Sequence, residues 1–425
     1  MTDTALPSAA AAERAAAPAD LTVAEPAEPY REAKRRLAAA VESASAEVLE
    51  LSHRIHANPE PAFEEAHAAG WIAETLRRHG YAVEHPAGSL ATAIRATRRG
   101  GRADGSSPKP RIGILAEYDA LPGLGHGCGH NTMAASGVGA AIALAAVADE
   151  LSGEIVFLGT PAEERGSGKA IMIEDGLFDG LDAALLFHPC DRNHVASIAL
   201  ASEDVEVVFH GLQAHAAADP WRGRNALDAM IQLFSAVGLW RQQLDPGNRV
   251  HGIIQEGGTA ANIIPDRTKA WFMLRSPDQA EYERIKARFS EIVQGAALAT
   301  DTTAEVTFSG GAMTVHPNAP LEERWVANAA AYGIVDQGPD PSAGSTDMGN
   351  VSWHCPTIHP ELAIAPEGTA GHSIAFRDAA ATPAADRTTL LAATLVAQVA
   401  YELFQDPELV AAAWRDFRAS GTASS

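Results

Sequence analysis

Residues 123–131 of this 425-residue chain read GLGHGCGHN, so two histidines and a cysteine lie within one short glycine-rich stretch. Imidazole nitrogen and thiolate sulfur are ligands that zinc and similar metal ions favour. The same stretch could instead be a glycine-rich turn whose histidines are only hydrogen-bonded, because so short a motif is not specific by itself. The motif therefore leaves two hypotheses open, a metal site and a structural turn.

Further side chains that bind metals or transfer protons follow other apolar segments. GTPAEE ends on Glu163 and Glu164, FHP contains His188, and GHS near the C-terminus contains His372. Of two adjacent glutamates, one can bind a metal ion while its neighbour, which faces the other way, takes a proton from water. Each motif also has a structural explanation, since two acids after a strand often begin a helix. The order of the motifs is more informative than any one of them.

Apolar strands and helical segments alternate around these motifs. RIGILAEYD, GEIVFLGTPAEE and DAALLFHP each read as an apolar strand that ends in polar residues, and one long amphipathic helix is predicted before them, from residue 30 to the NPEP stretch. Strands that alternate with helices predict an α/β fold with a mostly parallel sheet. Functional groups gather at the carboxyl ends of such strands, so we expect the motifs to meet at one edge of the sheet.

The pattern changes near residue 200. Residues 201–313 read as strand, helix, two strands, helix and strand, which is the split ferredoxin-like order. We therefore expect an inserted α+β domain at 201–313, between two parts of a catalytic domain at 29–200 and 314–425. Residues 1–28 are rich in alanine and proline and are expected to form a disordered tail.

Composition restricts the partners and the location. The chain has 32 lysines and arginines against 54 aspartates and glutamates, a formal net charge of −22 that disfavours nucleic acids and membrane surfaces as partners. Cys128, Cys190 and Cys355 are too few for a disulfide scaffold, and the last two read as small buried residues or free thiols. Neither a membrane span nor a signal peptide is apparent, so we expect a cytoplasmic protein.

Taken in order, AEYDALPGLGHGCGHN, GTPAEE, FHP, the insertion and GHS resemble the two-metal aminoacylase and carboxypeptidase family of metallopeptidases. The motifs are most similar to its amidohydrolase subfamily, which includes auxin-conjugate hydrolases and has a cysteine among its metal ligands. NIIP and GSTDMGNVS resemble the branch of aminobenzoyl-glutamate hydrolase and β-alanyl dipeptidases. The resemblance implies a metal-dependent amidohydrolase or peptidase that cleaves an N-acyl amino acid, an aryl-amide amino acid or a dipeptide. A deacylase or dipeptidase of another class, or a non-catalytic metal-binding scaffold, is the alternative.

The resemblance also implies a role for each motif residue. Glu163 would be the general base that activates a water molecule, and then the acid that protonates the leaving amine. Two divalent metal ions, zinc or manganese, would be the cofactors, and a cysteine thiolate would link them. The implied metal ligands are Cys128, His130, Glu164, His188 and His372.

In the inserted domain, the resemblance implies a lid that also forms a homodimer. His215 would reach the active site of the neighbouring subunit and stabilise the oxyanion. Asn262 and Arg275 would bind the backbone carbonyl and the carboxylate of the substrate, although a surface ion pair is the alternative for Arg275. The expected partners are thus a small amide or dipeptide substrate and a second copy of the chain.

The first strand end departs from the pattern of the wider family. That family commonly has His-x-Asp there, whereas this chain has EYD, so Glu117 replaces the first ligand histidine. His130 is then expected to supply the missing imidazole, and Asp119 to orient a metal ligand without binding the metal itself. His126 could be a ligand, a neighbour that orients a ligand, or a brace of its loop.

Overall fold

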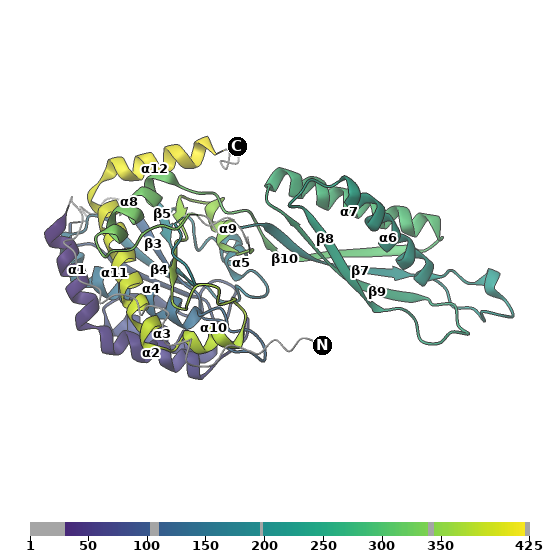
Figure 1. Ribbon diagram of the computed structural model, residues 1–425, viewed down its shortest axis with the longest axis horizontal. Helices are drawn as coiled ribbons and strands as arrows, with labels where there is room; N and C mark the ends of the chain where they lie inside the picture. The colour runs from purple at the N-terminus through teal and green to yellow at the C-terminus, as the bar shows by residue number, and fades with distance from the viewer. Residues whose placement is uncertain (1–29, 103–109, 196–198, 339–343, 421–425) are drawn as a thin grey trace, which may run out of the picture.

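The computed structural model describes residues 30–102, 110–195, 199–338 and 344–420. The tail predicted for residues 1–28 lies outside these ranges. Figure 1 shows two units, a larger one that contains both ends of the described chain and a slender one formed by residues 201–312. Each unit has its own hydrophobic core.

A six-stranded sheet forms the centre of the larger unit, in the order β1-β2-β4-β3-β5-β11. The strands are β1 (Ala82–Glu84), β2 (Ile94–Arg99), β3 (Arg111–Ala116), β4 (Glu154–Gly159), β5 (Ala183–Leu185) and β11 (Thr357–Ile358). The strands β4, β3, β5 and β11 run parallel to one another, whereas β1 and β2 pair in antiparallel fashion. The predicted α/β fold with a mostly parallel sheet is confirmed, although β2 was not predicted.

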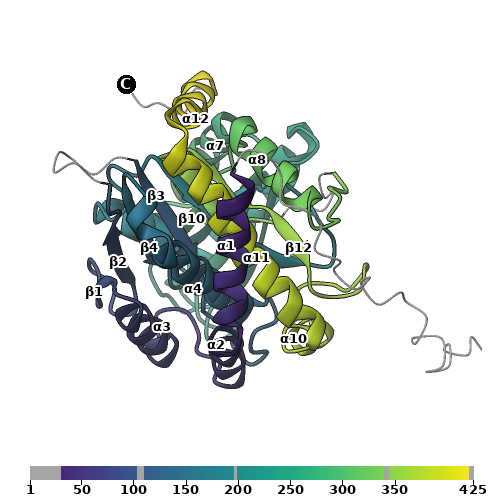
Figure 2. The same cartoon turned by 90° about the vertical axis from the view of Figure 1, so that its left-hand side faces the viewer.

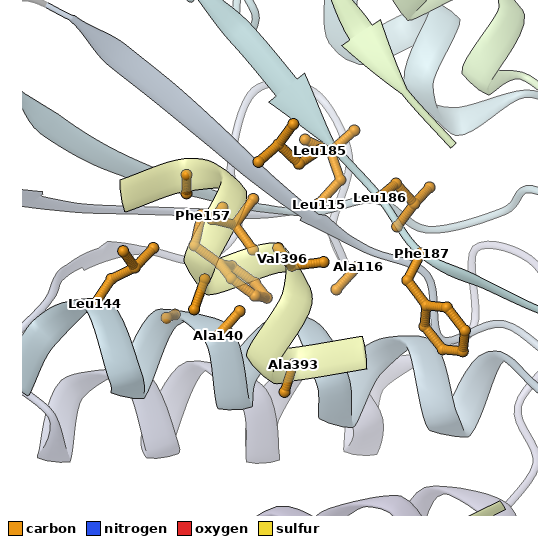
Figure 3. Packing of buried hydrophobic residues seen from close by; sticks show 14 of the residues in the cluster. Leu115, Ala116, Ala140, Leu144, Phe157, Leu185, Leu186, Phe187, Ala393 and Val396 are labelled. Atoms are coloured by element: carbon orange, nitrogen blue, oxygen red, sulfur yellow. The ribbon is translucent and has the colours of Figure 1, made fainter. Parts of the chain in front are cut away.

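The helices α4 (His130–Ala146) and α11 (Pro383–Gln405) pack against each other and against β3. Leu115 and Phe157 from the strands meet Leu144 and Val396 from these helices in the core (Figure 3). Nearly every residue of α4 is buried, which its many alanines and glycines permit because their small side chains allow close approach. The first residue of this buried helix, His130, is thereby held rigidly beside the sheet.

The remaining helices surround this core (Figure 2). They are α1 (Arg31–Ser43), α2 (Ser45–Ala57), α3 (Ala66–Arg78), α5 (Gly168–Glu174), α8 (Ala319–Ala330), α9 (Met348–Ser352), α10 (Ile374–Ala379) and α12 (Pro407–Ala419). The prediction of one long helix from residue 30 was wrong, because the chain leaves helical geometry at Ala44, where ψ is 2°. In the described ranges, no helix is both long and apolar enough to cross a membrane.

The slender unit is an antiparallel sheet covered by two helices. Its elements are β7 (Ala201–His210), α6 (Ala226–Trp240), β8 (Arg249–Glu256), β9 (Arg267–Ser276), α7 (Gln279–Ala299) and β10 (Thr303–Ala312). The strands lie in the order β10-β7-β9-β8, so β8 is at one edge. Phe209, Phe272 and Phe289 form part of the core between this sheet and the helices. A lid role for this unit stays a prediction.

A short parallel pair, β6 (His188–Cys190) and β12 (Glu361–Ala363), completes the larger unit. It continues the chain directly beyond β5 and β11, where Phe187 and His359 are buried. His188 is therefore placed by two segments that are far apart in the sequence.

Candidate metal centre

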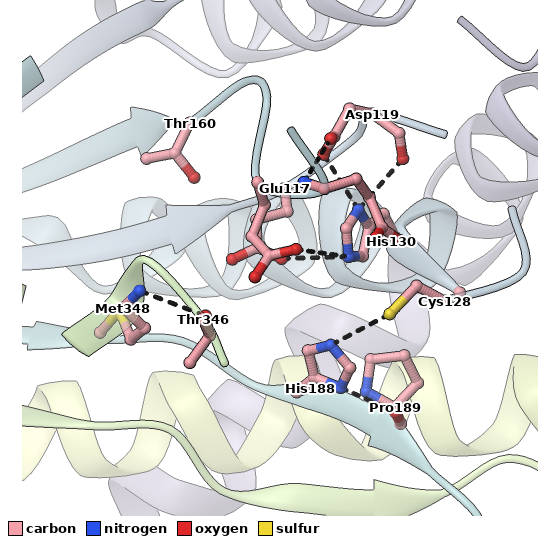
Figure 4. Close-up of polar contacts among 12 residues, drawn as sticks. Glu117, Asp119, Cys128, His130, Thr160, His188, Pro189, Thr346 and Met348 are labelled. Carbon is pink, nitrogen blue, oxygen red and sulfur yellow. Dashed lines mark hydrogen bonds and ion pairs between the residues drawn. The ribbon is translucent and has the colours of Figure 1, made fainter. Parts of the chain in front are cut away.

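The site lies where β3 and β4 end. Glu117 and Asp119 follow β3, and His130 begins α4 (Figure 4). Glu163 and Glu164 follow β4. All five side chains thus come from the carboxyl ends of adjacent parallel strands or from the helix that covers them. This edge is where open α/β sheets bind their ligands.

The backbone of the glycine-rich loop explains its composition. Gly129, between Cys128 and His130, has a φ of 79°, and a Cβ atom there would lie 2.8 Å from Cγ of Pro189. Only glycine combines that conformation with so close an approach. The backbone N–H of His372, itself at a φ of 54°, donates to the carbonyl of Gly127 at 3.0 Å. The loop and the GHS segment are therefore held together, with a backbone strain that is common at functional sites.

Cys128 belongs to two groups of side chains that could each hold a metal ion. In one group, ligand atoms of Cys128, His130 and His188 all lie within 4.8 Å of one another. In the other group, the same holds for Cys128, Glu164 and His372. The structure thus brings together all five residues that the sequence singled out as metal ligands, and Cys128 is common to both groups.

Asp119 holds both His130 and Glu164. The Nδ1 atom of His130 donates to a carboxylate oxygen and to the carbonyl of Asp119, each at 3.0 Å, and the other carboxylate oxygen accepts the Glu164 backbone N–H at 2.9 Å. Burial raises the pKa of Asp119, but the hydrogen bond and charge of His130, together with the Glu164 N–H and the charge of Lys169, outweigh it and lower the pKa. Because Nδ1 donates its proton to Asp119, Nε2 is the nitrogen of His130 that can bind a metal ion.

Several buried polar atoms at this site have no hydrogen-bond partner among the described residues. They are Oε1 of Glu164, and also Nε2 of His130 and Oε2 of Glu117, which lie 3.2 Å apart without forming a hydrogen bond. Unsatisfied buried polar atoms are costly, so their convergence calls for a cation that they can share. The donor set of sulfur, imidazole nitrogen and carboxylate oxygen fits a divalent ion of the zinc type.

The surroundings of Glu163 favour the protonated form of its carboxyl group. Its Oε2 lies 4.0 Å from Nε2 of His130. Burial, followed by the charges of Glu117 and Glu164, raises the pKa of Glu163 well above its usual range. Burial also raises the pKa of the Cys128 thiol. Groups of this kind bind a metal ion in exchange for protons, so the excess of buried negative charge fits a metal centre.

A buried lysine, which the sequence analysis did not single out, lies behind the site. Nζ of Lys169 donates to carboxylate oxygens of Glu117 and Asp347, each at 2.5 Å, and all three residues are at most 1% exposed. Burial by itself lowers the pKa of Lys169, but Asp347 and then Glu117 outweigh it and raise the pKa. The available signal was a lone lysine in the apolar stretch GSGKAIMI.

His126 lies outside all of the metal-ligand groups found among the described residues. Its Nε2 atom is 3.1 Å from the carbonyl oxygen of Ile55, and its ring stacks on His56 with 6.1 Å between centroids. Burial lowers its pKa to about 3, so this ring is neutral. Of the three alternatives for His126, this geometry favours a brace between the loop and α2.

A cavity of about 490 Å³ opens from Cys128 and Glu163 toward the slender unit. Arg275 on β9 lines it, and in the described part of the chain this arginine forms no ion pair. His215 and Asn262 do not line the cavity, because both are exposed on loops of the slender unit. Within one subunit, the structure therefore brings Arg275 near the site and leaves His215 and Asn262 away from it.

This fold and this cluster define a metal-dependent hydrolase, and the comparisons with known proteins agree. Residues 113–393 match peptidase family M20/M25/M40, so the chain belongs to that family and is a metal-dependent amidohydrolase. It is 36% identical to the human Xaa-Arg dipeptidase, over 91% of this chain and 92% of that protein. It is 32% identical to one of the subunits of the Escherichia coli p-aminobenzoyl-glutamate hydrolase, over 69% of this chain and 64% of that protein.

Solved structures show the same fold at lower sequence identity. A putative aminohydrolase from methicillin-resistant Staphylococcus aureus superposes with a TM-score of 0.72 at 21% identity, over 87% of this chain and 100% of that chain. A Bacillus subtilis protein, a dinuclear metal-binding peptidase of the M20 family, superposes with a TM-score of 0.64 at 21% identity, over 86% and 99%. The resemblance inferred from the motifs is thus confirmed at the level of the family and its reaction.

Proposed function

We propose that the chain is a two-metal hydrolase in which Cys128 links the two ions. The observation that supports this proposal is that the two ligand groups share the sulfur atom of Cys128. His130 and His188 would hold one ion with it, and Glu164 and His372 the other. The Bacillus subtilis relative of the same fold, which is described as binding two metals, supports this number. The Cys/His/Glu donor set suits zinc, with manganese as the second candidate.

When bound, the ions polarise the scissile carbonyl and make a water molecule more acidic. Glu163 is proposed to accept the proton of that water and to return it to the leaving amine. A carboxyl group whose pKa is raised by burial is a stronger base than an exposed one, so it is suited to accept that proton and to hold it until the amine leaves. Asp119 keeps His130 and Glu164 in position through its hydrogen bonds.

The proposed substrate is a dipeptide or an N-acyl amino acid with a free carboxylate. Arg275, which has no ion-pair partner in the described chain and lines the cavity, would bind that carboxylate. The relatives named for Xaa-Arg dipeptides and for p-aminobenzoyl-glutamate favour such substrates. The chain is also 28% identical to a Bacillus subtilis N-acetyl-L-cysteine deacetylase, so deacylation of N-acyl amino acids is the alternative activity. The cytoplasmic location remains a prediction from the sequence.

A substrate panel with controlled metal content tests this proposal. The metal-free protein, prepared with a chelator, is expected to be inactive, and zinc or manganese should restore hydrolysis of at least one class among Xaa-Arg dipeptides, β-alanyl dipeptides, p-aminobenzoyl-glutamate and N-acetyl amino acids. Released amine is measured for each class. Full activity of the metal-free protein would contradict the metal mechanism, whereas hydrolysis of N-acetyl amino acids alone would favour the deacylase.

We also propose a homodimer formed through the slender unit. The edge strand β8 exposes Ile253 and Ile254, with 56% and 43% of their surface accessible, and α6 exposes Leu239 at 77%. An open sheet edge with exposed apolar residues is a typical pairing surface. In the exposed loop, Nδ1 of His215 accepts backbone N–H groups of Ala217 and Ala218 at 3.2 Å. The ring proton is therefore on Nε2, where it could be donated to an oxyanion of the partner's site.

Mixing two inactive variants tests whether His215 acts on the neighbouring subunit. His215→Ala and Glu163→Gln are each expected to be nearly inactive alone. If they are co-expressed and the mixed dimers are isolated, one of the two sites of each dimer has both residues, so about one half of the wild-type activity should return. Activity is measured after purification through two different tags. A mixed dimer that stays inactive would contradict the exchange of His215 between subunits.

A further inference from the structure

A second cluster of metal-binding side chains lies beside the proposed two-metal centre. Ligand atoms of Cys190, His194 and Glu361 all lie within 4.8 Å of one another. None of the three is among the ligands proposed above, and the sequence analysis interpreted Cys190 only as a buried residue or free thiol. The cluster combines a sulfur, an imidazole and a carboxylate, so it is not a group of surface acids.

Backbone pairing places these side chains on one face. In the parallel pair of β6 and β12, Glu361 is opposite His188, and Ala363 is opposite Cys190. His194 and Glu361 exchange both backbone hydrogen bonds, at 3.0 and 2.8 Å. Directly paired residues, and residues two apart along a strand, share a face of a sheet. The three ligand residues are therefore brought together by the backbone itself.

His194 is oriented as metal-binding histidines usually are. The ring is 3% exposed, and its Nδ1 donates to the carbonyl oxygen of Gly338. This hydrogen bond leaves the lone pair on Nε2, and this buried atom has no hydrogen-bond partner within the described residues. A metal-binding imidazole typically donates its other N–H to a carbonyl or a carboxylate in this way. An ion at Nε2 would also remove the cost of leaving a buried acceptor unsatisfied.

We propose that Cys190, His194 and Glu361 form a third metal site, which binds a divalent ion of the zinc type. Three protein ligands leave one position of a tetrahedral ion for water or another small ligand. The cluster borders a cavity of about 560 Å³, so an ion can reach it from solvent. Glu361 on β12 is paired with His188 on β6. An ion bound by Cys190 of β6 and Glu361 of β12 would therefore link the two strands beside His188. Its role is to position His188 rather than to touch the substrate.

Counting bound zinc tests the third site. After equilibrium dialysis against zinc, the wild-type protein is expected to retain about three ions per chain, and Cys190→Ser and His194→Gln about two each. Cys355→Ser is the matched control, because Cys355 is a buried thiol that belongs to none of the ligand groups found in the described ranges, and it should retain about three. Two ions in the wild type, unchanged in His194→Gln, would overturn the proposal.

A spectroscopic test separates this site from the two-metal centre. In a Cys128→Ser protein, Cys190 is the thiol that remains in a ligand group of the described chain. When this variant is loaded with cobalt, it is expected to keep a near-ultraviolet sulfur-to-cobalt charge-transfer band. The double variant Cys128→Ser with Cys190→Ser should lose that band. A Cys128→Ser protein that binds cobalt without the band would show that Cys190 is not a ligand.

Discussion

Replacing Glu163 by glutamine is expected to lower kcat by about 100- to 10,000-fold, which is the usual contribution of a general acid and base. Glutamine keeps the shape of the side chain but can neither accept the proton of water nor return it to the amine. Glu163 is not needed for either of the two ligand groups that share Cys128. The metal content and the thermal midpoint of Glu163→Gln should therefore remain close to those of the wild type. The measurements are steady-state kinetics on the best substrate of the panel and metal analysis of the same preparation.

Two comparisons make the result specific. Glu74→Gln, on the exposed face of α3, changes the same functional group away from the site and should leave kcat unchanged. Glu164→Gln, in contrast, should lower the metal content together with the activity, because Glu164 is in a ligand group with Cys128. If Glu163→Gln turned over substrate nearly as fast as the wild type, Glu163 would not be the base. If it lost metal as Glu164→Gln does, Glu163 would be a ligand.

The arrangement of the fold was largely predictable because polar residues follow apolar strands at regular intervals. β3 and β4 are continuous apolar runs, which is typical of strands buried on both faces. The strand β2 was not predicted because IRATRR contains three arginines, and it is its pairing with β1 and β4 that makes it a strand. The helix break at Ala44 lies in ESASAE, where serines weaken helix propensity while the apolar pattern continues. In both segments, the local sequence pattern did not distinguish between the predicted and the observed secondary structure.

The grouping of the metal-ligand candidates was predictable in part for a similar reason, since the motifs that contain Glu164 and His188 follow strands of the same parallel sheet. Their roles as ligands, and those of His215 and Asn262 in a dimer, stay predictions. Lys169, Asp347 and the cluster around Cys190 could not be found from local patterns, because they depend on contacts between distant segments. The pairing of β6 with β12, for example, joins residues 188–190 to residues 361–363. Neither segment contains a sequence motif that predicts this pairing.

Replacing Lys169 by methionine is expected to lower the free energy of unfolding by about 3–5 kcal/mol, the usual cost of removing one partner from a buried ion pair. Methionine has a similar volume and leaves no large cavity. It does leave the carboxylates of Glu117 and Asp347 buried without their shared cation. The measurement is urea unfolding of metal-free protein, so that bound ions do not compensate for the lost charge.

Two controls separate charge from packing. Lys269→Met removes a partly exposed lysine paired with Glu206 and should change the free energy of unfolding by no more than about 1 kcal/mol. The triple variant Lys169→Met, Glu117→Gln and Asp347→Asn removes all three charges and should recover much of the stability, because no buried charge is then unpaired. A Lys169→Met protein as stable as the wild type would show that these carboxylates do not depend on the lysine.

The same lysine explains how this chain accommodates Glu117, where the wider family commonly has a ligand histidine. One oxygen of Glu117 is bound by Lys169, while the other lies 3.2 Å from Nε2 of His130. Without Lys169, the negative charge of Glu117 beside His130 and Glu163 would be uncompensated, so Glu117 would compete more strongly for the ions proposed to bind Cys128. We therefore expect Lys169→Met to alter metal binding as well as stability. Weaker discrimination between zinc and manganese in the variant, measured by competition dialysis, is the corresponding result.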